Sequence, residues 1–331
     1  MKRIAFYWGA STALFSSTVC ATPIVLPDAA SLAREANLVV VGRVESTSVG
    51  RTGADSRTVS LVVDRVLDQK SPLGGNRVDY EYSYADPDAS GPVKNSYGVF
   101  FLKCAENGAC RPVSAAMQYS VARPEFAGPG RLTGSTTDLV AAEMVNAIAQ
   151  PGSTEDLRSS AVRELSDLPL TAPLRDELVE VVRRGDAASR LAASAVLVSG
   201  GDISTVDLIS ADVVNPPQGC DALVSLAAVN VRSLQKVEPS SISTWSRWLR
   251  SSNVEVRRGA ASALSNIRSK EAAKVLARQA LDDADNDVLF YAVSSLIVNI
   301  GDSRHPVMDR FEKDPEFYRR RWQAWRQKNL N

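Results

Sequence analysis

The sequence has a single histidine, four cysteines and no excess of either charge, with 38 Lys and Arg against 38 Asp and Glu. One histidine, His305, excludes metal centres built from several histidines and makes any histidine-based triad depend on that residue. The zero net charge provides no basic surface of the kind that displaces counterions from nucleic acid, so no nucleic-acid partner is expected. The 331 residues, 44% of them hydrophobic, are typical of a folded protein of about two domains.

The first 21 residues have the form of a cleavable signal peptide. Lys2 and Arg3 precede a mostly apolar run, which ends at Ala21 in the small-residue pattern of a cleavage site. A membrane anchor is the alternative, but serines and threonines interrupt a run already short for a span of about 20 residues. An acylated Cys20 is a second alternative, which the bulky Val19 fits poorly. We predict cleavage after Ala21, a periplasmic or extracellular protein, and no stable membrane insertion afterwards.

Cys104 and Cys110 flank an Asn-Gly pair at 107–108, which is a strong hairpin signal. Two cysteines across a tight turn in an oxidising compartment are expected to form a disulfide. The spacing is not Cys-x-x-Cys, so we favour a structural bond over a redox site. Because the loop that the disulfide closes is small, the loss of chain entropy in the unfolded state stabilises the fold by only about 2–2.5 kcal/mol. Cys220 then remains as a buried thiol.

Residues 30–122 are predicted to form an all-β domain, either a small barrel or a sandwich. A β-branched run covers 36–44, and two later segments alternate apolar with polar residues. Turn-forming residues separate these segments, as in all-β folds. The candidate strands are 36–44, 59–66, 78–83, 97–102 and 111–113, with a short last one around Tyr119 and Val121.

Two of these segments, ANLVVVGRV at 36–44 and YGVFFL at 97–102, resemble the OB-type barrel of netrin-like modules. The tissue inhibitors of metalloproteinases belong to that group, so the resemblance implies a closed β-barrel. Those inhibitors reach the protease zinc through a mature N-terminal Cys-x-Cys. This chain has Cys20-Ala21-Thr22 and is expected to lose the cysteine, so the inhibitory mechanism is not implied.

After a Pro-, Gly- and Ser-rich linker at 123–136, residues 137–314 carry a repeating helical pattern. A first helix, capped by Thr137 or Asp138, ends before Pro151. Apolar quartets at i, i+4, i+8 and i+11 then recur, with a small residue at the second position where helices are expected to cross closely. Those second positions are Ala161, Ala192, Ala227, Ala260 and Ala292, spaced 31, 35, 33 and 32 residues apart. Second helices are predicted at 173–184, 203–213, 242–249 and 270–281, although Pro216 and Pro217 make the 203–213 repeat irregular.

A helix pair that recurs every 31–35 residues predicts an α-solenoid. The segments VEVRRGAASALSNI at 254–267 and NDVLFYAVSSLIVNIGD at 286–302 resemble the first helices of HEAT repeats of the short bacterial type. The resemblance implies a curved surface that binds a protein partner.

Two features invite a chemical interpretation. His305 lies next to Pro306, without a Gly-x-Ser-x-Gly elbow or a comparable nucleophile, which favours a loop histidine over a catalytic base. The acidic run 282–287 could be read as a calcium loop starting at Asp283. An EF-hand needs Gly at position 6 and Glu at position 12, where this chain has Val288 and Ser294. An acidic turn, with Asn286 or Asp287 capping the next helix, is the better interpretation.

The C-terminal segment 315–331 and one inner helix carry the candidate contact residues. Tyr318, Trp322 and Trp325 share one helical face, which favours a helix that caps the solenoid over one that binds a membrane or a nucleic acid. Trp245 and Trp248, spaced i, i+3, either pack in the core or form a contact patch. The candidates for partner binding are Trp245, Trp248, Arg320 and Arg326.

The sequence therefore predicts a multidomain protein with an N-terminal β-domain and a C-terminal HEAT-like solenoid. The expected function is non-catalytic protein–protein interaction outside the cytoplasm, with no catalytic residue, metal or cofactor. Two alternatives remain: protease-inhibitor-like or hydrolase-associated activity on the β-domain loops, and attachment to an envelope surface through the basic C-terminal helix.

Overall fold

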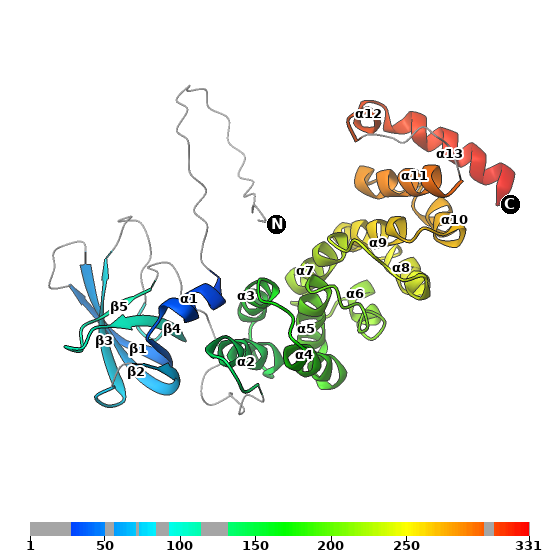
Figure 1. Cartoon of the computed structure of the whole chain (residues 1–331). Helices are drawn as coiled ribbons and strands as arrows, with labels where there is room; N and C mark the ends of the chain where they lie inside the picture. Colours follow the sequence, from blue (N-terminus) through cyan, green and yellow to red (C-terminus); the bar gives the residue numbers. More distant parts are fainter. Residues whose placement is uncertain are drawn as a thin grey trace, which may run out of the picture.

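The computed structural model describes residues 28–49, 56–70, 73–83, 93–113, 132–300 and 308–330. A β-barrel lies at one end, and a curved stack of helices leads away from it to the C-terminus (Figure 1). The N-terminal β plus C-terminal α-solenoid organisation predicted from the sequence is confirmed.

The barrel is closed and has the strand order β1-β2-β3-β5-β4. Each predicted strand up to residue 113 is present, while the short one around Tyr119 and Val121 lies outside the described residues. Most neighbours are antiparallel, and β3 meets β5 in parallel at the single pair Tyr80 and Cys110. The strands are β1 Leu38–Val49, β2 Ser56–Gln69, β3 Arg77–Ser83, β4 Tyr97–Cys104 and β5 Cys110–Pro112.

The strands β1 and β4 are buried on both faces. Val40 and Phe100 point into the barrel core, whereas Val41 and Phe101 belong to the hydrophobic core of the helices. This double burial explains why both strands read as continuous apolar runs, while β2 and β3 alternate. The barrel and the solenoid are thus joined by a shared core.

Two helices make this junction. Helix α1, Ala29–Glu35, begins after Asp28, whose side chain accepts a hydrogen bond from the Ser31 N–H, and it buries Leu32. Helix α2, Thr136–Ala149, begins with a capping box between Ser135 and Asp138. The N-cap is therefore Ser135, because its hydroxyl reaches the Asp138 N–H, and the prediction of Thr137 or Asp138 is wrong.

Polar contacts also cross the junction. Arg65 Nη2 of β2 lies 2.5 Å from Glu143 Oε2 of α2, and the Thr136 hydroxyl donates to Asp68 at 2.8 Å. Burial raises the pKa of Glu143, although the positive charge of Arg65 opposes this effect. Burial likewise raises the pKa of Tyr97, and the negative charge of the nearby Asp64 adds to this effect.

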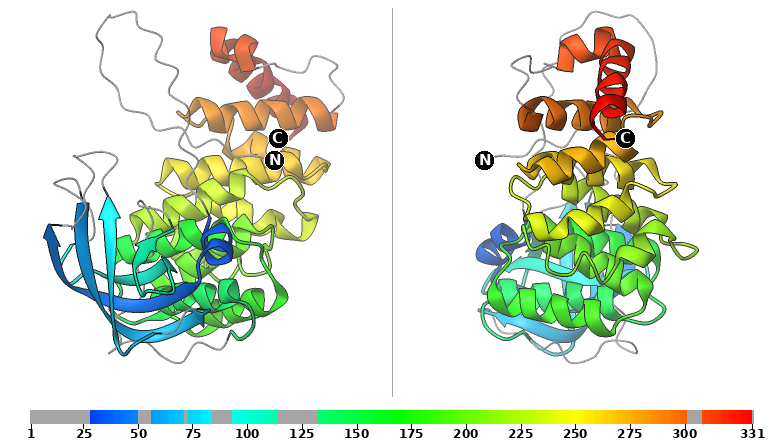
Figure 2. Two further views of the ribbon diagram at one scale, coloured as in Figure 1. Left: turned by 60° about the vertical axis from the view of Figure 1, so that its left-hand side comes forward. Right: turned by 90° about the vertical axis from the view of Figure 1, so that its right-hand side faces the viewer.

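The helices of the solenoid stack as two rows (Figures 1 and 2). The small residues predicted at the helix crossings are all buried, with Ala161 at 1% exposure and the other four at 0%. The first helices are α3 Glu155–Ser166, α5 Ala187–Ser199, α7 Asp221–Arg232, α9 Val254–Asn266 and α11 Asn286–Ile300. The second helices are α4 Ala172–Arg184, α6 Ser210–Val214, α8 Ile242–Trp248 and α10 Lys270–Gln279, with a short 3₁₀ turn η1 at Pro239–Ser241 before α8.

The repeat around residue 203 is the irregular one, as expected. Instead of a helix over 203–213, the chain forms successive turns and only the five-residue helix α6. The helix ends before Asn215 because the following Pro216 disfavours helical geometry at the residue before it. The last quartet also deviates, because Ile300 is 37% exposed and the buried positions are Leu296 and Ile297.

Two helices close the C-terminal end. Helix α12, Met308–Lys313, was not expected and buries Phe311, and helix α13, Pro315–Asn329, follows with Asp314 as its N-cap. The proline at the first helical position fits α13 because its missing N–H would have no partner there. Among the described residues, no helix combines the length and the apolar character needed to span a membrane.

Candidate interaction surfaces

The disulfide between Cys104 and Cys110 is present, with an S–S distance of 2.03 Å. The two cysteines face each other where β4 pairs with β5. Asn37 fixes the same point, because its amide donates to the Cys104 carbonyl and its side-chain oxygen accepts from the Cys104 N–H, both at 2.7 Å. The bond thus holds the short strand that completes the barrel.

A half-open groove of about 950 Å³ lies beside this disulfide. Its polar lining includes Asp79 and Glu81 of β3, Lys103 of β4 and Arg111 of β5, and Lys103 pairs with Glu35 at 3.3 Å. The groove can bind a small polar or charged group. Its lining residues contain no histidine and no serine, so it does not hold the serine–histidine pair of a serine hydrolase.

Trp245 and Trp248 lie in the core, and both are 0% exposed. Their rings pack edge to face with centroids 5.0 Å apart. Each indole N–H is satisfied internally, by Ser241 at 2.8 Å and by Ser210 at 3.1 Å. The contact-patch alternative for these two residues does not fit this burial, because a partner would reach them only if the repeat opened.

Arginine–aspartate pairs join successive repeats. Arg158 is 5% exposed; it donates to the carbonyls of Ile148 and Gln150 at the end of α2 and also reaches Asp186, the N-cap of α5. These bonds satisfy carbonyls that the helix end leaves free. Similar pairs between repeats join Arg175 to Asp202, Arg257 to Asp283 and Arg258 to Asp285, whereas Arg190 pairs with Asp212 within one repeat, between α5 and α6.

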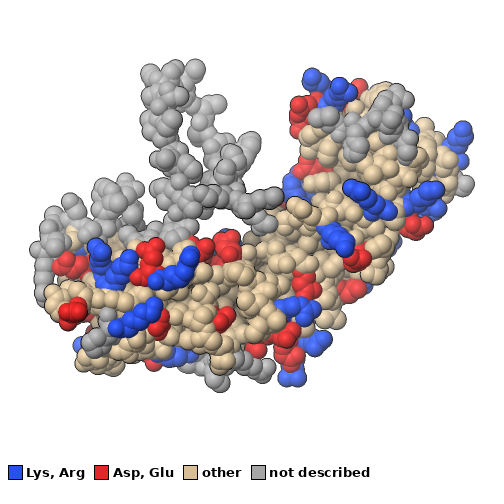
Figure 3. Space-filling model, in the orientation of Figure 1, with Lys and Arg blue, Asp and Glu red and all other residues tan. Residues whose placement is uncertain are grey.

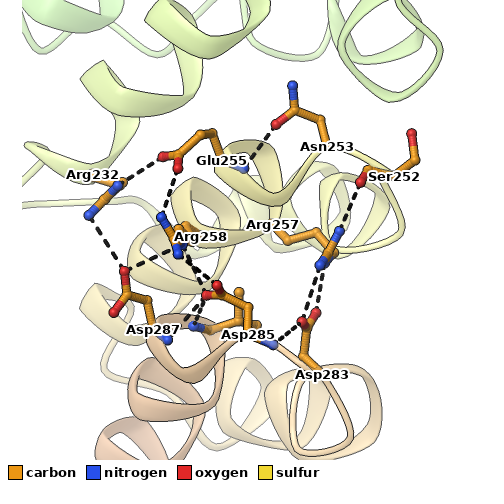
Figure 4. Close-up of polar contacts among 10 residues, drawn as sticks. Arg232, Ser252, Asn253, Glu255, Arg257, Arg258, Asp283, Asp285 and Asp287 are labelled. Atoms are coloured by element: carbon orange, nitrogen blue, oxygen red, sulfur yellow. Dashed lines mark hydrogen bonds and ion pairs between the residues drawn. The ribbon is translucent and has the colours of Figure 1, made fainter. Parts of the chain in front are cut away.

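The densest set lies between α7, α9 and α11 (Figure 4). Arg258 contacts Asp285 at 2.7 Å, Glu255 at 2.8 Å and Asp287 at 3.3 Å. Arg232 joins the same set through Glu255 at 3.0 Å. The hydrogen bond from Arg258 holds the pKa of Asp285 below its usual range.

The acidic run 282–287 is therefore neutralised by arginines. Asp285 accepts from the backbone N–H groups of Asp287 and Val288, so it caps α11, and the predicted cap at Asn286 or Asp287 is wrong. Within the described ranges, no group of three or more histidine, cysteine and acidic residues is arranged to hold a metal ion.

The arginines of α13 are partly engaged inside the molecule. Arg319 donates to the carbonyls of Leu281 and Asp283, and Arg326 pairs with Asp282 at 2.6 Å. The bond from Arg326 holds the pKa of Asp282 below its usual range. Trp322 is only 3% exposed. These contacts hold α13 against α10 and the residues that follow it.

The two arginines predicted to contact a partner thus differ in their surroundings. Arg326 is occupied by Asp282, whereas Arg320 lies on the exposed side of α13. His305 lies outside the described residues, as does the predicted signal peptide. The structure brings none of the four candidates together into one surface, because the two tryptophans are core residues.

The pattern of apolar positions did not predict the arginines that join neighbouring repeats, because it does not include charged residues. A signal was present, because Arg158, Arg175, Arg257 and Arg258 each precede their aspartate by 26–28 residues. That offset is close to the repeat length. It places each aspartate near the start of the following repeat.

These features define the class of protein. It is an α-solenoid of paired helices, whose repeats are joined by arginine–aspartate pairs, and it is fused to a closed β-barrel. Residues 218–297, which span α7 to α11, match the family model of HEAT repeats. This matched segment is thus similar to HEAT repeats, which are typical of protein-interaction modules. No curated protein matches the chain.

Proposed function

We propose that this chain is an exported, non-catalytic protein-interaction module that binds its partner on the solenoid. The observation that carries the proposal is the stack of helix pairs whose 218–297 segment matches HEAT repeats. A solenoid stabilised by contacts between neighbouring repeats leaves long surfaces available for a partner. No second activity is needed to account for this architecture.

Export is supported by two features of the sequence and the structure. The first 21 residues have the form of a signal peptide, and Cys104 bonds to Cys110. Disulfides persist mainly in oxidising compartments, so the bond fits a periplasmic or extracellular location.

Two alternatives have weaker support. The groove beside the disulfide gives the β-domain a place for a ligand or a protease-inhibitor-like contact, but its lining has no serine–histidine pair. Envelope attachment through α13 would need its aromatic face, yet Trp322 is buried and Arg326 is bound to Asp282. We propose Arg320 as a partner-contacting residue on the outside of α13, and Arg326 as a structural residue.

Site-specific photocrosslinking of the full chain in its native envelope tests the binding surface. A photoreactive residue replaces Arg320 or Lys274 on the solenoid, or Asp79 in the barrel groove as the matched control. Adducts with one protein from the solenoid positions support the proposal. Adducts from position 79 alone would transfer the binding role to the β-domain.

Mass measurement of the protein purified from its native host tests export. A mature chain that begins at Thr22 and gains two hydrogen atoms on reduction is expected. An uncleaved N-terminus with no gain on reduction would place the protein in a reducing compartment.

A further inference from the structure

The exposed face of α10 carries cations that the structure leaves without partners. Lys270, Lys274 and Arg278 are all exposed and are spaced i, i+4, i+8, so they follow one another along the same side of the helix. Arg268 in the preceding turn is also exposed. None of these four side chains forms an ion pair with any residue that the structure describes.

This face differs from the other arginine-rich parts of the solenoid. Between neighbouring repeats, arginines such as Arg257 and Arg258 form ion pairs with aspartates of the next repeat. On α10 the opposite side of the helix is buried through Ala272, Ala273, Leu276 and Ala277. The cations therefore contribute nothing to the packing between repeats.

Helix stability explains only one of the three cations, because Arg278 lies in the last turn, where the helix dipole favours a positive charge. Lys270 is the first residue of α10, where the positive end of the helix dipole disfavours a cation. The only carboxylate on the helix is Glu271, and it forms no ion pair with Lys274 in the described part of the chain. The three cations are nonetheless left without carboxylate partners in the described part of the chain, which points to a role outside the fold.

The position of the row suits a docking surface. The helix α10 lies on the outer side of the arc, in the row of second helices with α4, α6 and α8 (Figure 1). Charges of both signs are interspersed over the face of the molecule in Figure 3, and the sequence as a whole has as many acidic as basic side chains. Attraction of an acidic partner would thus be local to α10.

We propose that the exposed face of α10, formed by Lys270, Lys274 and Arg278, docks an extended acidic segment of the partner protein, with carboxylates on alternate residues. This inference rests on the proposed interaction function and adds the surface and the chemistry of the partner. Four helical residues advance about 6 Å. Two residues of an extended chain advance about 6.6–6.8 Å, so alternate carboxylates match the spacing of the cations.

A protein segment fits this face better than a membrane does. Surface-bound membrane helices insert apolar side chains next to their cations. The large apolar side chains exposed in the described structure include none on α10 or in the turn at Arg268. The row therefore lacks the apolar anchor that a lipid surface would use.

Fluorescence anisotropy with the full-length mature protein tests the proposal. The probe is a labelled peptide of alternating glutamate and serine, and the same peptide with glutamine in place of glutamate is the control. We expect salt-sensitive binding of the glutamate peptide alone. Replacement of Lys270, Lys274 and Arg278 by Gln should weaken it at least about tenfold, because each exposed ion pair contributes a modest amount.

Two matched variants control for general electrostatics and for folding. Gln at Arg163, Arg183 and Lys313, which are exposed on α3, α4 and α12, removes the same charge and should leave the affinity unchanged. Glu271→Gln removes the competing carboxylate and should tighten binding. Equal loss in both triple variants would overturn the proposal, as would a failure of Glu271→Gln to tighten binding.

Two further outcomes separate this inference from the proposed function. Binding of the protein to vesicles of phosphatidylglycerol and phosphatidylcholine, without binding of the peptide, would overturn the acidic-segment proposal in favour of a membrane surface. If the α10 triple variant still crosslinks the same partner from position 320, the α10 surface is wrong and the interaction function stands. If the wild type crosslinks nothing from any position, the interaction function itself fails.

Discussion

Single residues decide how closely the helices approach. Gly259 of α9 lies against the backbone of α7, and a Cβ added to it would come within 2.7 Å of the Ala228 carbonyl oxygen. The quartet pattern assigned the close crossing to Ala260, which is also fully buried. The tightest contact is thus one residue away from the position that periodicity selects, since periodicity registers apolar faces and does not register backbone distance.

Gly259→Ala is expected to destabilise the protein by about 1–3 kcal/mol, because the methyl group forces α7 and α9 apart. Helix propensity alone predicts the opposite sign, a gain of about 1 kcal/mol. Urea unfolding followed by tryptophan fluorescence measures the difference. Gly74→Ala is the control, because nothing lies within 4 Å of its added Cβ, and it should stay within about 0.5 kcal/mol of wild type. A stabilised Gly259→Ala protein would contradict the close approach.

At the scale of elements, polar pairs at the helix ends hold neighbouring repeats together. Asp285 caps α11 and at the same time receives two hydrogen bonds from Arg258 of α9. At the last contact between helices, Asp282 receives hydrogen bonds from Arg326 of α13. The apolar helix faces bury the bulk of the surface, and these pairs fix which helix ends meet.

Asp285→Asn is expected to lower the free energy of unfolding by about 1–3 kcal/mol at neutral pH, because the charged hydrogen bonds to Arg258 are lost. The folded-state pKa of Asp285 is lowered, so its contribution is present above the unfolded value of about 3.9 and is lost as the pH falls through the folded pKa. Denaturant titrations at neutral pH and at about pH 2–3 should therefore show the difference shrinking in acid. Asp167→Asn, at an exposed helix end, is the control. A difference independent of pH would show that the carboxylate charge is not involved.

Deletion of residues 315–331 is expected to loosen the last repeat. It removes Trp322 from the core and leaves the Ala277, Leu281 and Asp283 carbonyls without their arginine donors. Because repeats depend on their neighbours, hydrogen exchange should rise in α10 and α11 and stay unchanged in α3 to α7. Unaltered exchange in α11, together with loss of vesicle binding, would instead favour envelope attachment through α13.

At the scale of the molecule, the barrel and the solenoid behave as one packed body. Val41 and Phe101 on the outside of the barrel share a core with α1 and α2, and Arg65 meets the buried Glu143 across the junction. If a flexible linker separated the two domains, the outward-facing side chains of β1 and β4 would be exposed to solvent. The shared core instead fixes the solenoid against the barrel.

Arg65→Ala is expected to cost about 3–5 kcal/mol at neutral pH, because it leaves the Glu143 carboxylate buried without its partner. The pKa of Glu143 is already raised by burial, so the folded state is favoured below the unfolded value of about 4.3 and loses stability as the pH rises through the folded pKa. The defect should therefore diminish near pH 4. Glu143→Gln added to Arg65→Ala should recover most of the loss at neutral pH in urea unfolding. An unrescued double variant would show that Arg65 acts through packing alone.

The strands and most helices follow from local rules in the sequence. Alternation located β2 and β3, and the small residue recurring every 31–35 positions located the helix pairs. The Asn-Gly turn between two cysteines located the disulfide. Helices α1 and α12 were not predicted, because their 7 and 6 residues are too few to show a helical periodicity. The turns at 204–209 replaced a predicted helix in the one irregular repeat.

The candidate surfaces were less predictable. Trp245 and Trp248 have the same spacing whether they face the core or a partner, and only the packing of α6 and α8 buries them. Arg320 and Arg326 likewise look alike in the sequence. Arg326 faces Asp282, 44 positions earlier, while Arg320 stays exposed.

By itself, the sequence determined the two-part architecture, the repeat length and the disulfide, because apolar periodicity, turn chemistry and cysteine spacing act over a few residues. The tertiary structure decided which side chains remain on the surface, where the backbones touch and which charges are paired. Those properties depend on residues 23–44 positions apart that meet only when neighbouring helix pairs, or the C-terminal helix, pack together. For the same reason, the sequence alone did not single out the exposed cations of α10. Only the folded chain shows which arginines and lysines have no aspartate close to them.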